Sequence, residues 1–466
     1  MNNESSSDQI QRRRTGSVRL RLRTNTSRKL TAPQIIIIGF VLLIFIGGLL
    51  LTLPISSQSG SFTSLEDAMF TSVSAACVTG LTVQNTGAYW SLFGQVIIII
   101  LIQIGGLGFM TLAVMLSIFV KRQITPRERV VVAQSLGLSG AGGMVRLVKR
   151  ILLGTLIIEG SGAALLASQF IPEFGVVKGI GLGIFHSISA FCNAGFDLLD
   201  SLDGYRENYV VGITLMLLII LGGIGFIVWD DAVNLIKKHK RMSVYTRIVL
   251  ITTAILIVAG ALLIGIFEWN NPETIGNMSV GDKIFHSFFQ SVTTRTAGFD
   301  IIMNYKMTDS TQLICLVLML IGGASGSCAG GVKVGSFAVI VLAVRGYAAG
   351  RTEISVYNRR LSSDTISRAM TICAINLTAG VTGGLLVAII DKVPLLDALY
   401  ETISAISTVG LSLALSPELS LISHIIVMLL MFFGRVGILT VTFSIMLRLA
   451  KRSSCITYPD ANMLIG

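Results

Sequence analysis

Long and short apolar segments alternate along this chain. Runs such as 35–53, 93–120 and 421–449 approach or exceed the ~20 residues that a helix needs to cross ~30 Å of hydrocarbon. Eight such spans are predicted, at about 33–53, 90–120, 148–171, 208–235, 246–268, 308–345, 366–390 and 420–450. The pattern therefore predicts an all-α, polytopic membrane protein.

A shorter apolar helix is predicted between the two spans of each pair. These helices are expected near 64–76, 178–191, 281–293 and 394–405, and each is too short to cross a bilayer. They should enter the membrane and turn back. Such a re-entrant backbone is tolerated only where protein or water covers its unpaired polar groups.

Each short helix ends in a turn around one glycine. The turns read CVTGLTV from Cys77, CNAGFD from Cys192, RTAGFD from Arg295 and STVGLS from Ser407. Their central glycines recur at roughly a quarter of the chain length: Gly80, Gly195, Gly298 and Gly410. We call these four turns the glycine loops.

The second span of each pair carries its own repeated motif, which we call the echo. The echoes read IGGLGF from Ile104, LGGIGF from Leu221, IGGASG from Ile321 and FGRVGI from Phe433. Matched spacing in four places predicts four pseudo-repeats, each made of a helix, a re-entrant pore helix with its loop, and a helix. We expect them to surround a central pore with fourfold pseudosymmetry.

The predicted organisation follows from these repeats. It comprises a basic N-terminal arm, four pore repeats and a C-terminal tail, at 1–32, 33–120, 121–235, 236–345, 346–450 and 451–466.

Composition and charge agree with a membrane protein and orient it. Apolar residues make up 52% of the chain and charged residues 13%, with a net charge of +11. Lys and Arg collect in the N-terminal arm and near 121–150, 237–247, 345–368 and 448–452. Positive loops stay inside, so both termini are expected in the cytoplasm, with lipid headgroups rather than nucleic acid as partners of the basic arm. Acidic residues on the other face could concentrate cations, or could be scattered surface carboxylates.

The chemistry of the glycine loops suits a monovalent cation. An inward-pointing short helix directs its partly negative carboxyl end at the centre, and glycine allows the positive φ that can turn carbonyls one way. Backbone oxygens are the expected ligands, because no loop residue beside the glycines is charged; this favours K⁺ over Na⁺. The residues expected to bind the ion are Val78, Thr79, Gly80, Asn193, Ala194, Gly195, Thr296, Ala297, Gly298, Thr408, Val409 and Gly410. Any one glycine alone could serve packing instead.

The third echo departs from the others. Residues 322–335 read GGASGSCAGGVKVG, and glycines that each cost ~1 kcal/mol make a straight helix doubtful. A broken span below the loops suits a gate, although G-x-x-x-G spacing also suits a tightly packed helix. The residues expected to form the gate are Gly322, Gly323, Gly326, Gly330, Gly331, Lys333 and Arg435.

Several isolated polar residues lie inside spans. Arg435 is expected to face the axis, as a barrier or an anchor, and Lys333 could face the gate or reach the cytoplasmic interface. Glu159 should meet a buried partner. His186 and His286, at matching places on two pore helices, are expected to be packed rather than to bind metal. No catalytic motif or C-x-x-C pair is present, so neither an enzyme nor an organic cofactor is expected.

Together these motifs resemble the membrane subunit of the Ktr potassium-uptake systems, within the Trk/Ktr/HKT superfamily. The resemblance covers 33–450. It implies K⁺ uptake across a bacterial plasma membrane by a homodimer, controlled by an octameric ring of a nucleotide-binding cytoplasmic subunit of the KtrA type. It also implies that 322–335 is an intramembrane gating loop and that Arg435 faces the pore. Members that prefer Na⁺ often carry serine at the first loop glycine, where this chain has Gly80.

Two other functions stay open at this point. One is Na⁺ or mixed Na⁺/K⁺ uptake of the HKT type, and the other is a membrane receptor or scaffold without transport. The sequence does not indicate the degree of selectivity, any coupling to Na⁺ or the ligand of the regulatory subunit.

Overall fold

The computed structural model describes residues 32–108, 144–199, 202–238, 241–351 and 353–437. These residues all belong to one unit, which begins at Ala32. The N-terminal arm, the C-terminal tail, 109–143 and the end of the last predicted span lie outside the described residues.

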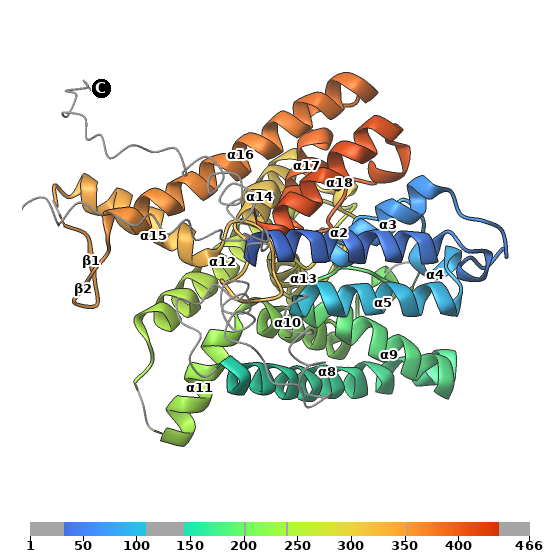
Figure 1. Cartoon of the computed structure of the whole chain (residues 1–466), viewed down its shortest axis with the longest axis horizontal. Helices are drawn as coiled ribbons and strands as arrows, with labels where there is room; N and C mark the ends of the chain where they lie inside the picture. The colour runs from blue at the N-terminus through green and yellow to red at the C-terminus, as the bar shows by residue number, and fades with distance from the viewer. Residues whose placement is uncertain (1–31, 109–143, 200–201, 239–240, 352, 438–466) are drawn as a thin grey trace, which may run out of the picture. The chain divides into compact units, whose positions relative to one another are not determined.

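The first helix of each predicted repeat is long and unbroken (Figure 1). These helices are α2 (Ala32–Leu51), α8 (Met144–Phe174), α12 (Val244–Glu268) and α16 (Ser363–Asp391). Among the described residues they are the four single helices that are long and apolar enough to cross a membrane. Their outer sides are apolar and open: Leu156 on α8 is 70% exposed and Ile389 on α16 is 72% exposed. Such surfaces are stable against lipid tails but not against water.

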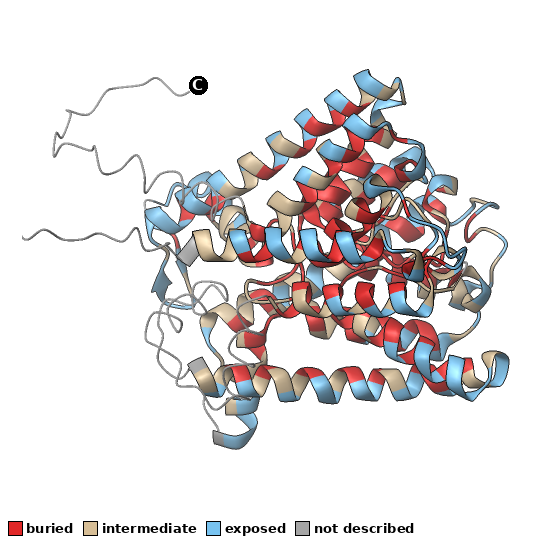
Figure 2. Cartoon of the chain, turned by 45° about the vertical axis from the view of Figure 1, so that its right-hand side comes forward, coloured by how far each residue is buried: buried red, intermediate tan, exposed pale blue. Residues whose placement is uncertain are grey.

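Four short helices form the buried centre, as predicted. They are α3 (Leu65–Cys77), α9 (Val176–Phe191), α13 (Val280–Thr293) and α17 (Leu395–Ser407). Serine hydroxyls cap two of them: Ser64 accepts from Asp67 N and Ser279 accepts from Asp282 N. Buried residues concentrate on these helices and exposed ones on the outer helices (Figure 2).

The second helix of each repeat is shorter than predicted. These helices are α5 (Leu92–Leu107), α10 (Tyr209–Gly223), α14 (Asp309–Leu320) and α18 (Leu421–Val436). The prediction of unbroken spans at 90–120, 208–235 and 420–450 is therefore wrong. Three of these helices, α5, α10 and α18, end within their echoes, where Gly108, Gly225 and Gly437 take φ of +83°, +93° and +87°. After α10 the chain bends by 94° into α11 (Phe226–Lys238).

The third repeat breaks where the sequence predicted. Residues 321–333, which we call the intramembrane loop, join α14 to α15 (Val334–Ala348) without a helical turn of their own. The alternative of a tightly packed helix is therefore wrong. Ile321 and Val332 pair in an isolated parallel bridge that closes the loop at its base.

The remaining elements are short. A hairpin of β1 (Ser355–Val356) and β2 (Arg359–Arg360) pairs antiparallel, Ser355 opposite Arg360 and Val356 opposite Arg359. One helical turn, α4 (Thr86–Tyr89), and four 3₁₀ turns, η1 (Pro54–Ser56), η2 (Leu202–Tyr205), η3 (Asn304–Lys306) and η4 (Ser416–Glu418), lie in the connections.

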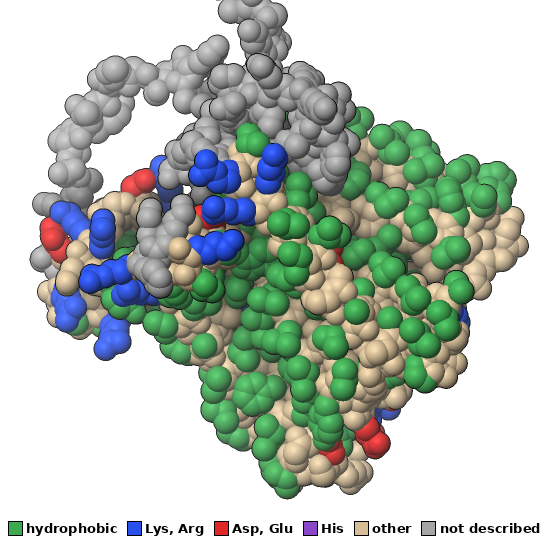
Figure 3. All heavy atoms as spheres, turned by 90° about the horizontal axis from the view of Figure 1, so that it is seen from below, with side chains coloured by type: hydrophobic (Ala, Val, Ile, Leu, Met, Phe, Trp, Pro, Cys, Tyr) green, Lys and Arg blue, Asp and Glu red, His purple; other side chains and the backbone are tan. Residues whose placement is uncertain are grey.

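Basic side chains gather at one end of the face that Figure 3 shows. Exposed Lys and Arg come from the start of α8, the α11–α12 connection, the end of α15 and the hairpin, and include Lys149, Arg241, Arg345, Arg359 and Arg360. Hydrophobic side chains spread over much of the rest of that face. Charge is thus separated from the apolar belt.

One packing device recurs in all four repeats. A serine or threonine of each pore helix donates to a carbonyl of the preceding long helix: Ser72 to Ile44 O, Ser187 to Glu159 O, Ser291 to Ile257 O and Thr402 to Gly380 O, over 2.7 to 3.1 Å. Beside each bond a glycine of the long helix lies against a leucine of the second helix, and a Cβ there would overlap that leucine. These pairs are Gly47 with Leu101, Gly162 with Leu218, Gly260 with Leu318, and Gly383 with Leu430. The device fixes each pore helix between its two neighbours.

Candidate ion-coordinating site

The four glycine loops meet one another in chain order. A Cβ placed on Gly80 would lie 3.2 Å from Gly195 Cα, one on Gly195 would lie 2.9 Å from Gly298 Cα, and one on Gly298 would lie 3.1 Å from Gly410 Cα. The sequence closes on itself, because a Cβ on Gly410 would lie 3.0 Å from Gly80 Cα. The structure therefore brings the four predicted loops into one closed circle, in which a side chain at any central glycine would strike the next loop.

The loop backbones share one unusual conformation. Each central glycine has a positive φ, between +68° and +95°, and so does the residue two positions before it: Val78, Asn193, Thr296 and Thr408, between +51° and +69°. Left-handed backbone costs a residue with a Cβ of the order of 1–3 kcal/mol and persists where the surroundings enforce it. Repetition of the same strain in four loops indicates that the circle requires it.

Backbone amides of the loops point back to their own pore helices. Thr79 N donates to Ser74 O, Ala194 N to Ser189 O, Ala297 N to Thr293 O and Val409 N to Ser404 O, over 2.8 to 2.9 Å. The carbonyl oxygens of Thr79, Ala194, Ala297 and Val409 each lie beside the glycine of a neighbouring loop, 2.2 to 2.7 Å from the position of a Cβ placed there. Carbonyl oxygens that are free of protein donors are the ligands that a dehydrated K⁺ requires.

Hydroxyl groups complete this support, and sequence analysis missed them. Ser74 and Ser404 accept from the amides of Gly80 and Gly410 at 3.1 and 3.0 Å. In the other two repeats the hydroxyl donates instead, Ser189 to Phe196 O at 2.9 Å and Thr293 to Phe299 O at 2.6 Å. A hydroxyl six residues before each glycine, or five in the third repeat, was the available signal.

The echoes explain how the pore helices end so close to the second helices. A Cβ on Gly105, Gly222 or Gly434 would overlap the carbonyl oxygen of Ala76, Phe191 or Ile406, which lies four residues before the loop glycine. The equivalent Gly322 instead meets the backbone of Gly330, within the intramembrane loop. The first, second and fourth echoes therefore pack on pore helices, whereas the third echo packs on its own loop.

The intramembrane loop lies against the inner end of the fourth glycine loop. A Cβ on Gly330 would come within 3.0 Å of Ser407 O and would overlap the Thr408 hydroxyl. The bent second helix also holds the loop, because Ala324 N donates to Gly223 O at 2.8 Å and Cys328 N donates to Gly222 O at 3.1 Å. In return, Phe226 N donates to Gly326 O at 2.8 Å.

Three cationic side chains bond to this loop. Arg435 donates to Cys328 O and also to Gly105 O and Gly106 O, at 2.5 and 3.0 Å for the last two. Lys333 Nζ donates to Ala329 O at 2.6 Å, within the loop. Arg295, whose binding role the sequence did not suggest, donates to Gly322 O at 2.8 Å. Of the two roles predicted for Arg435, this geometry is that of an anchor.

The isolated polar residues find protein partners. Gln103 of α5 donates to both carboxylate oxygens of Glu159, at 3.2 and 3.3 Å, which identifies the predicted buried partner. His186 lies 2.7 Å from Asp197 and 2.8 Å from Leu182 O. The equivalent of His186 is Gln290 rather than His286, because Ser187 and Ser291 make the same bond to their long helices. Within the described residues no group of His, Cys, Asp and Glu could hold a metal ion.

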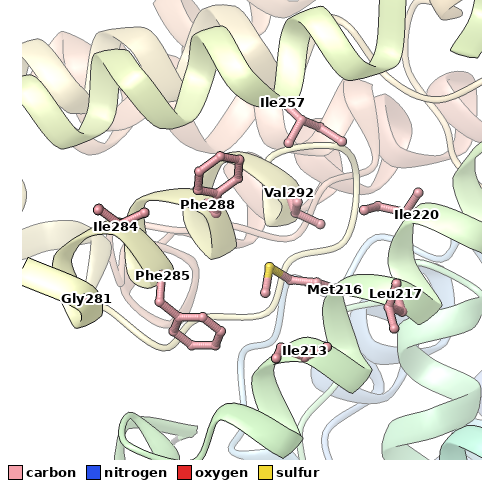
Figure 4. Close-up of a pocket in the computed structure, with 10 residues that line it drawn as sticks. All are labelled: Ile213, Met216, Leu217, Ile220, Ile257, Gly281, Ile284, Phe285, Phe288 and Val292. Carbon is pink, nitrogen blue, oxygen red and sulfur yellow. The ribbon is translucent and has the colours of Figure 1, made fainter. Parts of the chain in front are cut away.

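An apolar groove of about 550 Å³ lies between α10, α12 and α13 (Figure 4). Ile213, Met216, Ile284, Phe285 and Phe288 line it, among others. It offers hydrocarbon where a cation needs oxygen, so it is distinct from the circle of loops.

Comparison with known proteins identifies the family. The family model for TrkH, described as cation transport protein, matches residues 15–454. The chain is 39% identical over 440 residues to the Ktr system potassium uptake protein B of Bacillus subtilis, covering 94% of this chain and 97% of that protein. It is 37% identical over 450 residues to the potassium/sodium uptake protein NtpJ of Enterococcus hirae, covering 96% and 99%.

The fold agrees with a solved member. The crystal structure of the potassium transporter TrkH from Vibrio parahaemolyticus matches with a TM-score of 0.70 at 18% identity, covering 90% of this chain and 86% of that one. The predicted family, the all-helical multi-pass membrane fold and the absence of an enzymatic role agree with these findings. The chain belongs to the TrkH family of cation transport proteins.

Proposed function

We propose that this protein is the membrane subunit of a Ktr-type potassium-uptake system, in which four pseudo-repeats surround one pore. The single observation that carries the proposal is the closed circle of Gly80, Gly195, Gly298 and Gly410. The names of the B. subtilis and E. hirae relatives, which both include potassium uptake, point the same way.

The glycine loops act as the selectivity filter in this proposal. K⁺ exchanges its water for backbone oxygens at the twelve loop positions named above, from Val78 to Gly410. Amides that are bonded back to the pore helices support this role, because they hold the carbonyls in place before the ion arrives. The absence of charged ligands favours K⁺, which loses water more readily than Na⁺.

The intramembrane loop acts as the gate. Its close approach to Ser407 and Thr408, at the start of the fourth glycine loop, supports this role, because a segment there could obstruct an ion that leaves the filter. Gly322, Gly323, Gly326, Gly330 and Gly331 allow it to fold compactly. Lys333 caps it, and Arg435 holds it closed against α5 and α18.

Partners and orientation follow from the same assignment. Membership of a Ktr system implies further subunits, and we propose a homodimer on an octameric ring of nucleotide-binding KtrA-type subunits. The gathered basic side chains of Figure 3 would face that ring, with both termini in the cytoplasm of a bacterial cell.

Na⁺ enters as a second candidate for one reason. The E. hirae relative is named a potassium/sodium uptake protein. Na⁺ would then be a coupled or competing ion on the same path. Gly80, rather than serine, at the first loop favours K⁺ as the main substrate.

Uptake of ⁸⁶Rb⁺ into K⁺-loaded proteoliposomes tests the proposal. Wild-type protein should accumulate Rb⁺, excess external K⁺ should suppress the uptake more strongly than Na⁺, and Gly80→Asp should abolish it. Gly60→Asp is the matched control, since Gly60 also has a positive φ, of +67°, but no atom within 4 Å of its Cβ position. Unchanged uptake by Gly80→Asp, or no uptake by wild type, would refute the filter.

A further inference from the structure

Behind the circle of glycines, three pore helices place a large polar side chain at one equivalent position. The position directly precedes the serine or threonine that bonds the long helix, and it holds His186, Gln290 and Glu401. Each of the three is at most 1% exposed. In the first repeat the position holds Thr71, the smallest side chain of the four. Burial of three such groups beside one site is costly unless each has a bonding role.

Each of the three reaches the segment that follows its own glycine. His186 Nε2 lies 2.7 Å from Asp197 Oδ1, two residues after Gly195. Gln290 Nε2 donates to Asn304 Oδ1 at 2.8 Å, six residues after Gly298. Glu401 accepts from the hydroxyl of Ser416, beyond Gly410. The pore helices thus hold the loops on both sides of the glycine.

Neighbouring repeats join these bonds into a wider network. Tyr400 of α17 donates to Asn304 Oδ1 at 3.1 Å, which links the fourth pore helix to the third loop. His424 of α18 lies 2.8 Å from Ser416 O and 2.5 Å from Glu66 Oε1 on α3, which links the fourth loop to the first pore helix. A shift of the segment that follows one loop glycine would therefore displace side chains of the next repeat.

We propose that His186, Gln290 and Glu401 are positioning residues that set the preference of the filter for K⁺ over Na⁺. The inference rests on the proposed function, because it assumes that ions pass through the circle of glycines. The three side chains fix the segments that follow the loop glycines, and they thereby hold the filter at a width that matches dehydrated K⁺. An apolar side chain in their place would leave the half-buried Asp197, or the buried Asn304 or Ser416, without this partner, and the segment would move to regain a hydrogen bond.

The chain itself supplies the conservative replacement, since glutamine stands at the equivalent position of the third repeat. His186→Leu removes the bond to Asp197, and His186→Gln can restore it. The readout is the K⁺-over-Na⁺ preference of the full-length protein in proteoliposomes, from ⁸⁶Rb⁺ uptake in competition with each ion. His186→Leu should lower the preference by about tenfold and His186→Gln by no more than about twofold, in keeping with the loss or retention of one buried hydrogen bond.

Ser187→Ala is the matched control for loosened packing. It removes a buried bond from the adjacent residue, but that bond runs to Glu159 O on α8 and away from the loop. It should lower thermal stability and leave the preference unchanged. Wild-type preference in His186→Leu, or an equal loss in Ser187→Ala, would overturn the proposal.

The other two positions keep the test decisive if His186→Leu does not fold. Gln290→Leu should lower the preference and Gln290→His should retain it, and the same split is expected of Glu401→Leu and Glu401→Gln. Equal preference within both pairs would overturn the proposal, whatever His186 does. Failure of the proposed function would look different, because wild-type protein would then carry no K⁺ in the same vesicles.

Discussion

The glycine loops and the intramembrane loop are both irregular backbone at membrane depth, but they are held in opposite ways. Each glycine loop takes its main amide bonds from its own pore helix, as Thr79 does from Ser74 and Val409 from Ser404. The intramembrane loop is bonded within its own repeat as well, but it also takes bonds from other repeats: Gly222 and Gly223 in the second and Arg435 in the fourth. A loop fixed by its own helix is rigid locally, whereas a loop fixed by neighbours depends on how those neighbours sit.

The four echoes make the same contrast within one motif. Gly105, Gly222 and Gly434 pack on pore-helix carbonyls just before the glycine loops, while Gly322 packs on Gly330 and its repeat lacks that contact. The third repeat thus lacks the contact between echo and pore helix that the other three repeats have. A segment of this repeat could therefore move without loosening the packing behind the other three glycine loops.

Blocking the close contact between an echo and its pore helix in another repeat should have the largest effect on the protein. Gly222→Ala would put a Cβ into Phe191 O, whereas the adjacent Gly223→Ala meets only Asn193 Nδ2 at 3.6 Å. We expect Gly222→Ala to lose about 1–3 kcal/mol of stability through overpacking, and Gly223→Ala to remain near wild type. Thermal unfolding in detergent measures both. Equal melting temperatures would mean that the echo does not fix the filter.

Locking the intramembrane loop should nearly stop transport. Cys192, at the end of α9, and Cys328, in the loop, are both buried and free, and both lie next to Gly222: Cys328 N donates to Gly222 O at 3.1 Å, and a Cβ on Gly222 would overlap the carbonyl of Phe191, which precedes Cys192. Oxidation by iodine should join them and hold the loop under the filter. Rb⁺ uptake should then fall close to background and recover with dithiothreitol.

Cys328→Ser controls for other oxidation, since Cys77, Cys315 and Cys373 remain in that variant. Its uptake should be insensitive to iodine. A wild-type protein whose Cys192–Cys328 disulfide is demonstrated by mass spectrometry, and which still transports at the full rate, would show that the loop does not gate.

The sequence could predict what repeats and what breaks the repeat. Four glycines at quarter intervals were enough to predict the loops, and the glycine density of 322–335 was enough to predict the broken helix. The helix ends at Leu107, Gly223 and Val436 were missed, because a glycine pair inside an apolar run fits a packed helix equally well until the facing carbonyl is known. The partner of Glu159 was missed for a related reason: Gln103 lies in another repeat, and pairing across helices depends on rotation that hydropathy does not record.

Releasing the anchor should have an intermediate effect. Arg435→Ala removes the bonds to Cys328, Gly105 and Gly106, so the loop loses its link to α5 and α18. Charge-assisted bonds of this kind are worth roughly 1.5–3 kcal/mol, so basal Rb⁺ uptake should rise by about tenfold or more. Arg435→Lys keeps the charge but not the forked pair of donors, so its basal uptake should lie between that of wild type and that of Arg435→Ala. A fall in uptake by Arg435→Ala at normal expression would mean that the arginine supports the open path rather than the closed one.

The smallest effect is expected where the loop meets a single neutral donor. Tyr245 of α12 donates its hydroxyl to Ser325 O at 3.2 Å. Tyr245→Phe keeps the ring and removes only this bond, which is worth about 0.5–1.5 kcal/mol, so basal uptake should rise by roughly twofold to tenfold and less than in Arg435→Ala. If the loop is held by the sum of its neighbours, Tyr245→Phe combined with Arg435→Ala should multiply the two increases. A double variant no faster than Arg435→Ala alone would instead mean that the arginine by itself keeps the loop in place, and that its other contacts follow passively.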